Sequence, residues 1–148
     1  MPTEKIQQAS ADPRLAELST SELLEGILLF LGDEGFSEQD VYRFFSTLET
    51  ENEALAGRFR VKGVPPHQSS EPLRKTLSFF AMGKILEMPQ PNPVVQYYRA
   101  RSSQLQSLRK NLCVRQVLPA QKTLLQSLAD EFHRSLPSQP GARQRAKA

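Results

Sequence analysis

Cysteine, histidine and tryptophan are scarce in this sequence, which has one cysteine, two histidines and no tryptophan in 148 residues. The single cysteine, Cys113, cannot form an internal disulfide, which is typical of the cytoplasm or another reducing compartment. A metal site needs several Cys, His or carboxylate ligands at suitable spacing, and the sequence offers no such group. We therefore expect an intracellular chain without a metal or other cofactor.

Long apolar runs and glycine-rich loops are also missing. No run reaches the roughly 18 apolar residues of a membrane span, and residues 1–10 lack the basic start and apolar stretch of a secretory signal. The seven glycines are scattered and form no phosphate-binding loop. A nucleophile–base pair of Cys113 and His133 is conceivable, but nothing around these residues marks it. We expect no membrane association, no enzymatic activity and no small-molecule substrate.

Charge is unevenly distributed along the chain. The net charge is +3, but residues 1–56 carry three basic and twelve acidic side chains, a net charge of −9. Residues 57–148 carry sixteen basic and four acidic side chains, a net charge of +12. Such a basic part predicts a polyanionic partner such as nucleic acid. Alternatively, the acidic and basic faces neutralise each other across the fold or across a dimer.

The first half of the sequence predicts two capped helices after a loose tail over residues 1–18. Ser19 and Glu22 have the spacing of a capping box, and a wide apolar arc follows as far as Gly32. A second helix is expected from Ser37, because apolar residues then recur at i, i+3, i+4 and i+7. Residues 53–58 suggest a short helical piece, residues 59–62 a short strand, and residues 63–68 a proline-containing loop.

A third helix and a hairpin are predicted next. The helix begins at Ser69 or Ser70, has Pro72 in its first turn and ends at Gly83. Two β-prone runs, 84–88 and 94–98, flank a turn with three prolines and indicate a hairpin. Further helices are expected over residues 101–136, with a new helix starting at Pro119. A basic disordered tail follows over residues 137–148.

The segment 70–98 therefore has a specific order of capped helix, glycine, short strand, stiff turn and second strand. This order resembles the recognition helix and wing of winged helix-turn-helix regulators, over 29 of the 148 residues. In that family the helix enters the major groove of DNA, and the hairpin touches the adjacent backbone or minor groove. The resemblance implies nucleic-acid contacts by Ser70, Arg74, Lys75 and Ser78 on the helix, Lys84, Gln90, Asn92 and Gln96 in the wing, and Arg99 and Arg101 after it.

The sequence departs from that family between its second and third helices. The stretch from residue 59 to 68 is longer than the usual turn of about three or four residues, and it contains paired prolines. Either the preceding helix is displaced, or the segment is a helix–hairpin unit with another purpose.

The expected fold is mainly α, with a compact, winged-helix-like domain over residues 19–100 that contains one β-hairpin. C-terminal helices over residues 101–136 follow, with leucine stripes that would let two subunits pair. The function predicted is non-enzymatic binding of nucleic acid, as a DNA-binding regulator or accessory factor. The alternative is a protein–protein adaptor or assembly factor that uses amphipathic helices and complementary acidic and basic faces.

Overall fold

The computed structural model describes residues 9–32, 34–64, 67–87 and 97–136, apart from the side chains of residues 118–120. In this part of the chain five α-helices accompany a small antiparallel sheet, which confirms the expected mainly helical fold with a hairpin. The helices are α1 (Thr20–Leu31), α2 (Glu38–Glu51), α3 (Glu71–Met82), α4 (Leu105–Val114) and α5 (Val117–Ser135). The strands are β1 (Phe36–Ser37), β2 (Leu86–Glu87) and β3 (Tyr97–Ala100).

Capping side chains explain where the first three helices begin. Ser19 and Glu22 form the predicted capping box of α1, and Ser37 and Asp40 form a second one at α2. In each box the serine hydroxyl accepts from a backbone N–H while the carboxylate accepts from the serine N–H, so unpaired donors at the helix start are satisfied. At α3 the Ser70 hydroxyl accepts from the Leu73 N–H.

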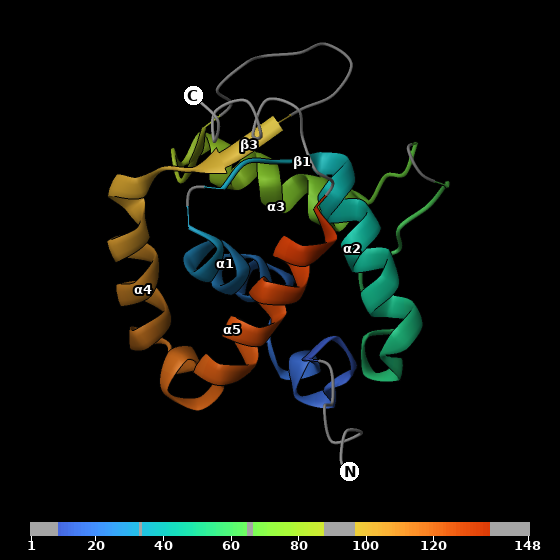
Figure 1. Ribbon diagram of the computed structural model, residues 1–148, viewed down its shortest axis with the longest axis horizontal. Coiled ribbons are helices and arrows are strands. Elements are labelled where there is room, and N and C mark those ends of the chain that lie inside the picture. The colour runs from blue at the N-terminus through green and yellow to red at the C-terminus, as the bar shows by residue number, and fades with distance from the viewer. Residues whose placement is uncertain (1–8, 33, 65–66, 88–96, 137–148) are drawn as a thin grey trace.

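The sheet brings two distant parts of the chain together in the order β1-β3-β2. Strands β2 and β3 form the expected hairpin pair, with Leu86 opposite Ala100. Strand β1, which the sequence analysis missed, pairs with the other edge of β3 and sets Phe36 opposite Tyr98. The sheet and α3 therefore lie together at one end of the molecule (Figure 1).

Helix α5 crosses α1 at the centre of the fold (Figure 1). Gly26 of α1 lies directly under Leu125 of α5, and the missing side chain of the glycine is what permits this close approach. The Phe132 ring of α5 packs edge-on against Phe44 of α2 and Phe36 of β1, with centroid distances of 5.2 and 5.7 Å. Helix α5 thus joins α1, α2 and the sheet in one core.

The N-terminal segment differs from the loose tail expected over residues 1–18. Ala9–Ala11 and Pro13–Glu17 form 3-10 turns, and Leu15 is completely buried. Two side chains hold the segment. The Asn52 amide donates to the carbonyls of residues 10 and 12 at 3.1 and 2.9 Å. The Arg58 guanidinium donates to the carbonyls of residues 16 and 18 at 3.0 and 2.8 Å. The expectation was wrong for residues 9–18 because their partners lie far away in the sequence, from 40 positions for Asn52 with residue 12 to 122 positions for Glu131 with Ala9. Residues 1–8 lie outside the described ranges.

The connection from α2 to α3 is long, but hydrogen bonds from its backbone to side chains of α2 hold it in position. Residues 53–55 form only a 3-10 turn, and the predicted strand over residues 59–62 is reduced to a single bridge between Lys62 and Ser69. The Glu49 carboxylate accepts from the Phe59 and Arg60 amides, and the Gln39 side chain exchanges two hydrogen bonds with the backbone of Gln68. Helices α2 and α3 pack directly against each other despite the length of this connection.

The C-terminal helices form part of the core and are not a separate pairing unit. Leu108 and Leu112 of α4 and Leu125 and Leu128 of α5 are buried within the chain, against α1 and each other. A dimer formed through these leucine stripes would have to pull the core apart. Helix α5 begins at Val117, two residues before the expected start, and has non-helical backbone angles at Gln121. The predicted tail, residues 137–148, lies outside the described ranges.

Candidate functional site

Helix α3 presents one side to the core and the other to solvent. Leu73, Leu77 and Phe80 are buried at i, i+4 and i+7, as the sequence predicts. The opposite side is exposed and consists of Glu71, Arg74, Lys75, Ser78, Phe79 and Met82. Three of the predicted contact residues, Arg74, Lys75 and Ser78, therefore lie on a free helix face.

Ser70, in contrast, is a structural residue. Its side chain is buried, and its hydroxyl donates to the Phe59 carbonyl at 2.6 Å while accepting from the Leu73 amide at 3.2 Å. Both hydrogen-bonding functions are occupied in tying α3 to the preceding connection. The prediction that Ser70 contacts nucleic acid is not supported by this geometry, because the residue is only 3% exposed.

The first group of cations lies near the start of α3, around Glu71. The Arg74 Nη2 atom lies 2.6 Å from a carboxylate oxygen of Glu71, and the Lys75 ammonium lies 3.9 Å from the same oxygen. The hydrogen bond from Arg74 holds the pKa of the Glu71 carboxyl below its ordinary value. Both cations remain largely exposed, and such exposed pairs rearrange at small free-energy cost.

The second group lies beyond the other end of α3, around Glu87 of β2. The Arg99 guanidinium donates two hydrogen bonds to one carboxylate oxygen, and an Arg101 nitrogen lies 3.8 Å from the other. The Arg101 amide donates to the Ile85 carbonyl at 2.9 Å, which places Arg101 beside the turn that holds Lys84. Lys84 is exposed and has a left-handed backbone, with φ of 64°.

The two groups place five cations and two carboxylates on α3, β2 and β3 or directly beside them. The net charge of these residues is +3: Arg74, Lys75, Lys84, Arg99 and Arg101 against Glu71 and Glu87. Between the groups, the exposed side of α3 carries Phe79 and Met82, which are 69% and 82% exposed. The remaining predicted contact residues, Gln90, Asn92 and Gln96, lie outside the described ranges.

Sequence reasoning missed both carboxylates and both apolar side chains. Phe79 and Met82 lie off the stripe of Leu73, Leu77 and Phe80, so the helical period of 3.6 residues would have marked them as exposed. The pairing of Arg99 with Glu87 depends on the register of β2 against β3, which places these residues opposite each other.

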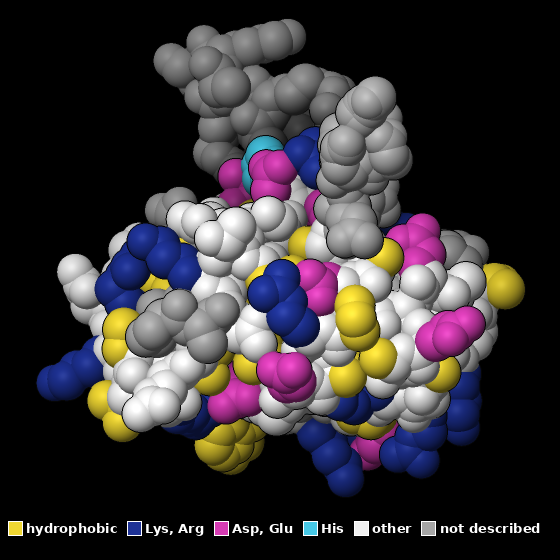
Figure 2. Space-filling view, turned by 90° about the horizontal axis from the view of Figure 1, so that it is seen from below, with side chains coloured by type: hydrophobic (Ala, Val, Ile, Leu, Met, Phe, Trp, Pro, Cys, Tyr) yellow, Lys and Arg dark blue, Asp and Glu magenta, His cyan; other side chains and the backbone are white. Residues whose placement is uncertain are grey.

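Among the residues that the structure describes, no ion pair joins the acidic first half to these cations, although the pKa of the Arg74 guanidinium is raised mainly by its ion-pair partner on α3 and in small part by Glu38 of α2. The carboxylates of the first half pair elsewhere with the basic half, as Glu22 and Glu25 do with Arg115, the residue after α4, at 3.6 and 3.3 Å. Glu25 is almost fully buried in α1, and this burial raises the pKa of its carboxyl, although Arg115 opposes the shift. Figure 2, which views the molecule from the side away from α3 and the sheet, shows Lys and Arg side chains interspersed with Asp and Glu side chains.

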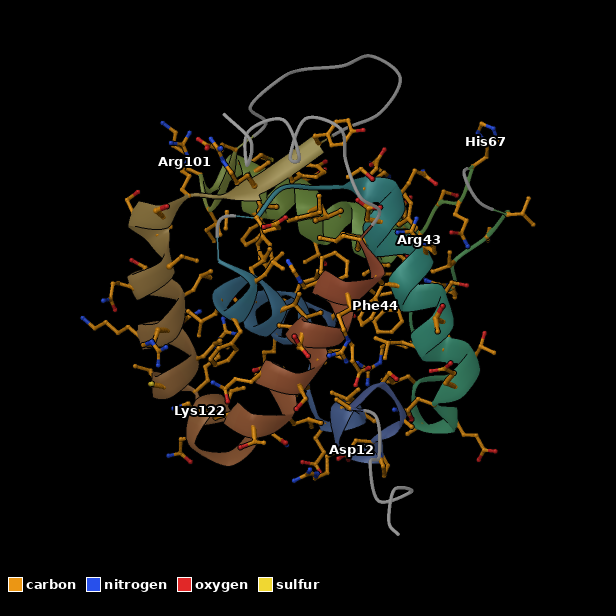
Figure 3. All side chains as sticks on the ribbon, in the orientation of Figure 1. Asp12, Arg43, Phe44, His67, Arg101 and Lys122 are labelled. Atoms are coloured by element: carbon orange, nitrogen blue, oxygen red, sulfur yellow. The ribbon has the colours of Figure 1, made fainter. Side chains whose placement is uncertain are left out.

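Other places in the described ranges offer less. A hollow of about 420 Å³ lies between the end of α1 and α5 and is lined by Phe30, Leu31 and His133, among others. His67 lies at the tip of the α2–α3 connection, far from the core (Figure 3). Cys113 is exposed on α4. Among the residues described, His, Cys, Asp and Glu side chains nowhere gather in threes in a way that would hold a metal ion, and no helix is both long and apolar enough to cross a membrane.

The exposed face of α3 with the adjoining strands is therefore the candidate site. The chain matches no protein-family model, and neither a curated protein nor a solved structure gives a match.

Proposed function

We propose that this chain binds duplex DNA through α3, β2 and β3. The observation that carries the proposal is the set of five exposed or half-exposed cations on these three neighbouring elements or directly beside them. The order α3-β2-β3 supports it, because a helix followed by a hairpin is the order in which segment 70–98 resembles winged helix-turn-helix regulators. Under this proposal α3 is the recognition helix.

The two groups of cations have different tasks in this proposal. Arg74 and Lys75 lie on the free side of α3. Arg74 would meet base edges or phosphates in the major groove, and Lys75 would meet phosphates. Lys84, Arg99 and Arg101 lie beyond the other end of the helix and would meet the backbone. The cations would leave the carboxylates of Glu71 and Glu87 for DNA phosphates, which is possible because the cationic side chains are half-exposed or more and such pairs are weak.

Fluorescence anisotropy of a labelled random duplex, at salt concentrations from about 50 to 200 mM, tests the proposal. Each phosphate contact contributes about −0.9 to the slope of log affinity against log salt. We expect steep salt dependence for the unchanged chain. Lys75→Ala should weaken binding to every sequence by a similar factor. It should also make the slope less negative by about 0.9, the contribution of one phosphate contact.

A matched control is Lys122→Ala, which removes an exposed lysine near the start of α5 that is remote from Arg101 (Figure 3). It should leave the affinity unchanged. The proposal fails if no duplex binds at low salt, or if Lys122→Ala weakens binding as much as Lys75→Ala does.

A second candidate function, docking of a protein partner, is favoured by the exposure of Phe79 and Met82. Exposed aromatic and methionine side chains inside a charged rim are typical of protein interfaces. A stoichiometric protein that co-purifies with the chain, is lost with Phe79→Ser and competes with DNA would favour this function over the first.

A further inference from the structure

Phe79 and Met82 form an apolar centre on the free side of α3. They are three residues apart, so they are neighbours on the helix surface. In the described part of the chain the other large exposed apolar side chains are scattered, as Val64 in the α2–α3 connection, Tyr97 on β3 and Val114 on α4. Among the residues described, α3 is the one element on which two such side chains adjoin.

The fold itself does not require these two side chains. The adjacent Phe80 fills the core and is 1% exposed, whereas the Phe79 ring points away from that core and lies 6.5 Å from the Phe80 ring. Because Phe79 and Met82 remain mostly in water, they contribute little burial to folding. Their apolar surface is available to a partner.

The charges around this centre indicate what the partner looks like. Lys75 precedes Phe79 by one turn, while Lys84, Arg99 and Arg101 lie beyond Met82. A complementary partner has negative charge on two sides and an apolar surface between them. The major groove of DNA has this form where it contains thymine, since phosphates line both rims and the thymine C5-methyl groups project from the floor. At about 12 Å the groove is also wide enough for a helix.

We infer that α3 reads thymine methyl groups through Phe79 and Met82. The inference rests on the proposed function and makes it more specific, because it gives the site a chemical preference. The substrate is duplex DNA with thymine in the major groove. Double-stranded RNA is excluded on two grounds, since uracil lacks the methyl group and the A-form major groove is too narrow and deep for a helix.

Two DNA duplexes that differ only in this methyl group provide the test, one of alternating adenine and thymine and one of alternating adenine and deoxyuracil. In each duplex the base pairs alternate regularly, so α3 meets the same kinds of base pair wherever the chain binds. No specific target sequence therefore has to be known. We expect the unchanged chain to bind the thymine duplex about fourfold more tightly if one methyl is buried, and roughly fifteenfold if two are.

The variants Phe79→Ala and Met82→Ala should each reduce this preference, and together they should bring it close to one. Lys75→Ala should weaken binding to both duplexes by the same factor, since it removes a charge and no methyl contact. Val114→Ala, which shortens an exposed apolar side chain on α4, should change neither affinity. All four positions are exposed, and a thermal melt of each variant verifies that it folds.

Failure of this inference is distinguishable from failure of the proposed function. Equal, salt-dependent binding of both duplexes would overturn the reading of methyl groups and leave DNA binding intact. A thymine preference that survives Phe79→Ala with Met82→Ala would also overturn it, because duplex shape would then be the cause. Absence of binding to either duplex at low salt would remove the proposed function and this inference together.

Discussion

Gly26 permits the closest approach between the two central helices, so replacing it with alanine is a direct test of the core. A Cβ atom at residue 26 would lie 2.7 Å from both δ-carbons of Leu125 and 3.0 Å from its γ-carbon. Leu125 is completely buried in a close-packed core, so moving its side chain away would displace its neighbours. The added methyl group therefore overpacks the interface between α1 and α5.

Two opposing effects set the size of the change. Alanine is favoured over glycine in a helix interior by about 1 kcal/mol, while overpacking a core costs about 1–3 kcal/mol. Because three carbons lie within 3.0 Å, we expect a cost near the upper end and a net loss of about 1–2 kcal/mol in the free energy of unfolding. This corresponds to a decrease of about 3–6 °C in melting temperature for a chain of this size.

Urea titration followed by circular dichroism measures this loss, and a double-mutant cycle with Leu125→Ala identifies its cause. Leu125→Ala alone should cost about 2–5 kcal/mol, because it leaves a cavity. In that background Gly26→Ala should become stabilising by about 1 kcal/mol, since the methyl group enters the cavity and the helix propensity remains. If the two changes are simply additive, or if Gly26→Ala stabilises the unchanged chain, the packing argument is refuted.

Three further changes test separate features. Asn52→Ala removes the buried amide that holds two carbonyls of the N-terminal segment. It should lower the free energy of unfolding by about 2–4 kcal/mol and speed amide hydrogen exchange in residues 9–18. Unchanged exchange in these residues would contradict the role of Asn52 in holding the segment. Burial raises the pKa of the Glu25 carboxyl in the folded chain above its ordinary value of 4.5. The folded chain therefore binds the carboxyl proton more tightly than the unfolded chain does. The free energy of unfolding should fall as the pH rises from the unfolded-state pKa through the folded-state pKa. Glu25→Gln should flatten this dependence in urea titrations between about pH 4 and 7, and an unaltered profile would refute it. Lys84 has a left-handed backbone, which asparagine tolerates and valine does not. In thermal melts Lys84→Asn should be nearly neutral, and Lys84→Val should cost about 1–3 kcal/mol in stability. Equal costs for the two variants would count against backbone strain.

Local signals in the sequence were sufficient for much of the fold. The capping box of Ser19 and Glu22 and the start of α2 at Ser37 depend on residues three positions apart, and the structure confirms both. The buried faces of α2 and α3 follow from the helical period. The hairpin of β2 and β3 also follows from a local pattern, since its strands are close in sequence.

Features that depend on distant residues were not predictable in this way. Strand β1 has only two residues, and it forms because Phe36 pairs with Tyr98 and packs on Phe132. The burial of residues 9–18 depends on Asn52, Arg58 and α5. The leucine stripes of α4 and α5 showed that these helices bury a face, but a stripe does not say whether the covering surface belongs to the same chain.

The candidate site was predictable to a similar degree. Helical periodicity is enough to place Arg74 and Lys75 on the exposed side of α3. It is not enough to assign Ser70, because a serine that caps a helix and one that binds a phosphate have the same sequence signature. The carboxylates that pair with the cations become visible only when the strands are aligned, as for Glu87 and Arg99.

The crossing of α5 over α1 has a consequence for the chain during its synthesis. Leu125 is made about 100 residues after Gly26, which at 5–20 residues per second means a delay of roughly 5–20 s. Throughout that interval the apolar arc of α1 lacks the helix that shields it in the finished fold. A ribosome-bound nascent chain that has not yet reached α5 should therefore be a good client for chaperones that recognise exposed leucine and isoleucine, and the vulnerability should end when α5 emerges.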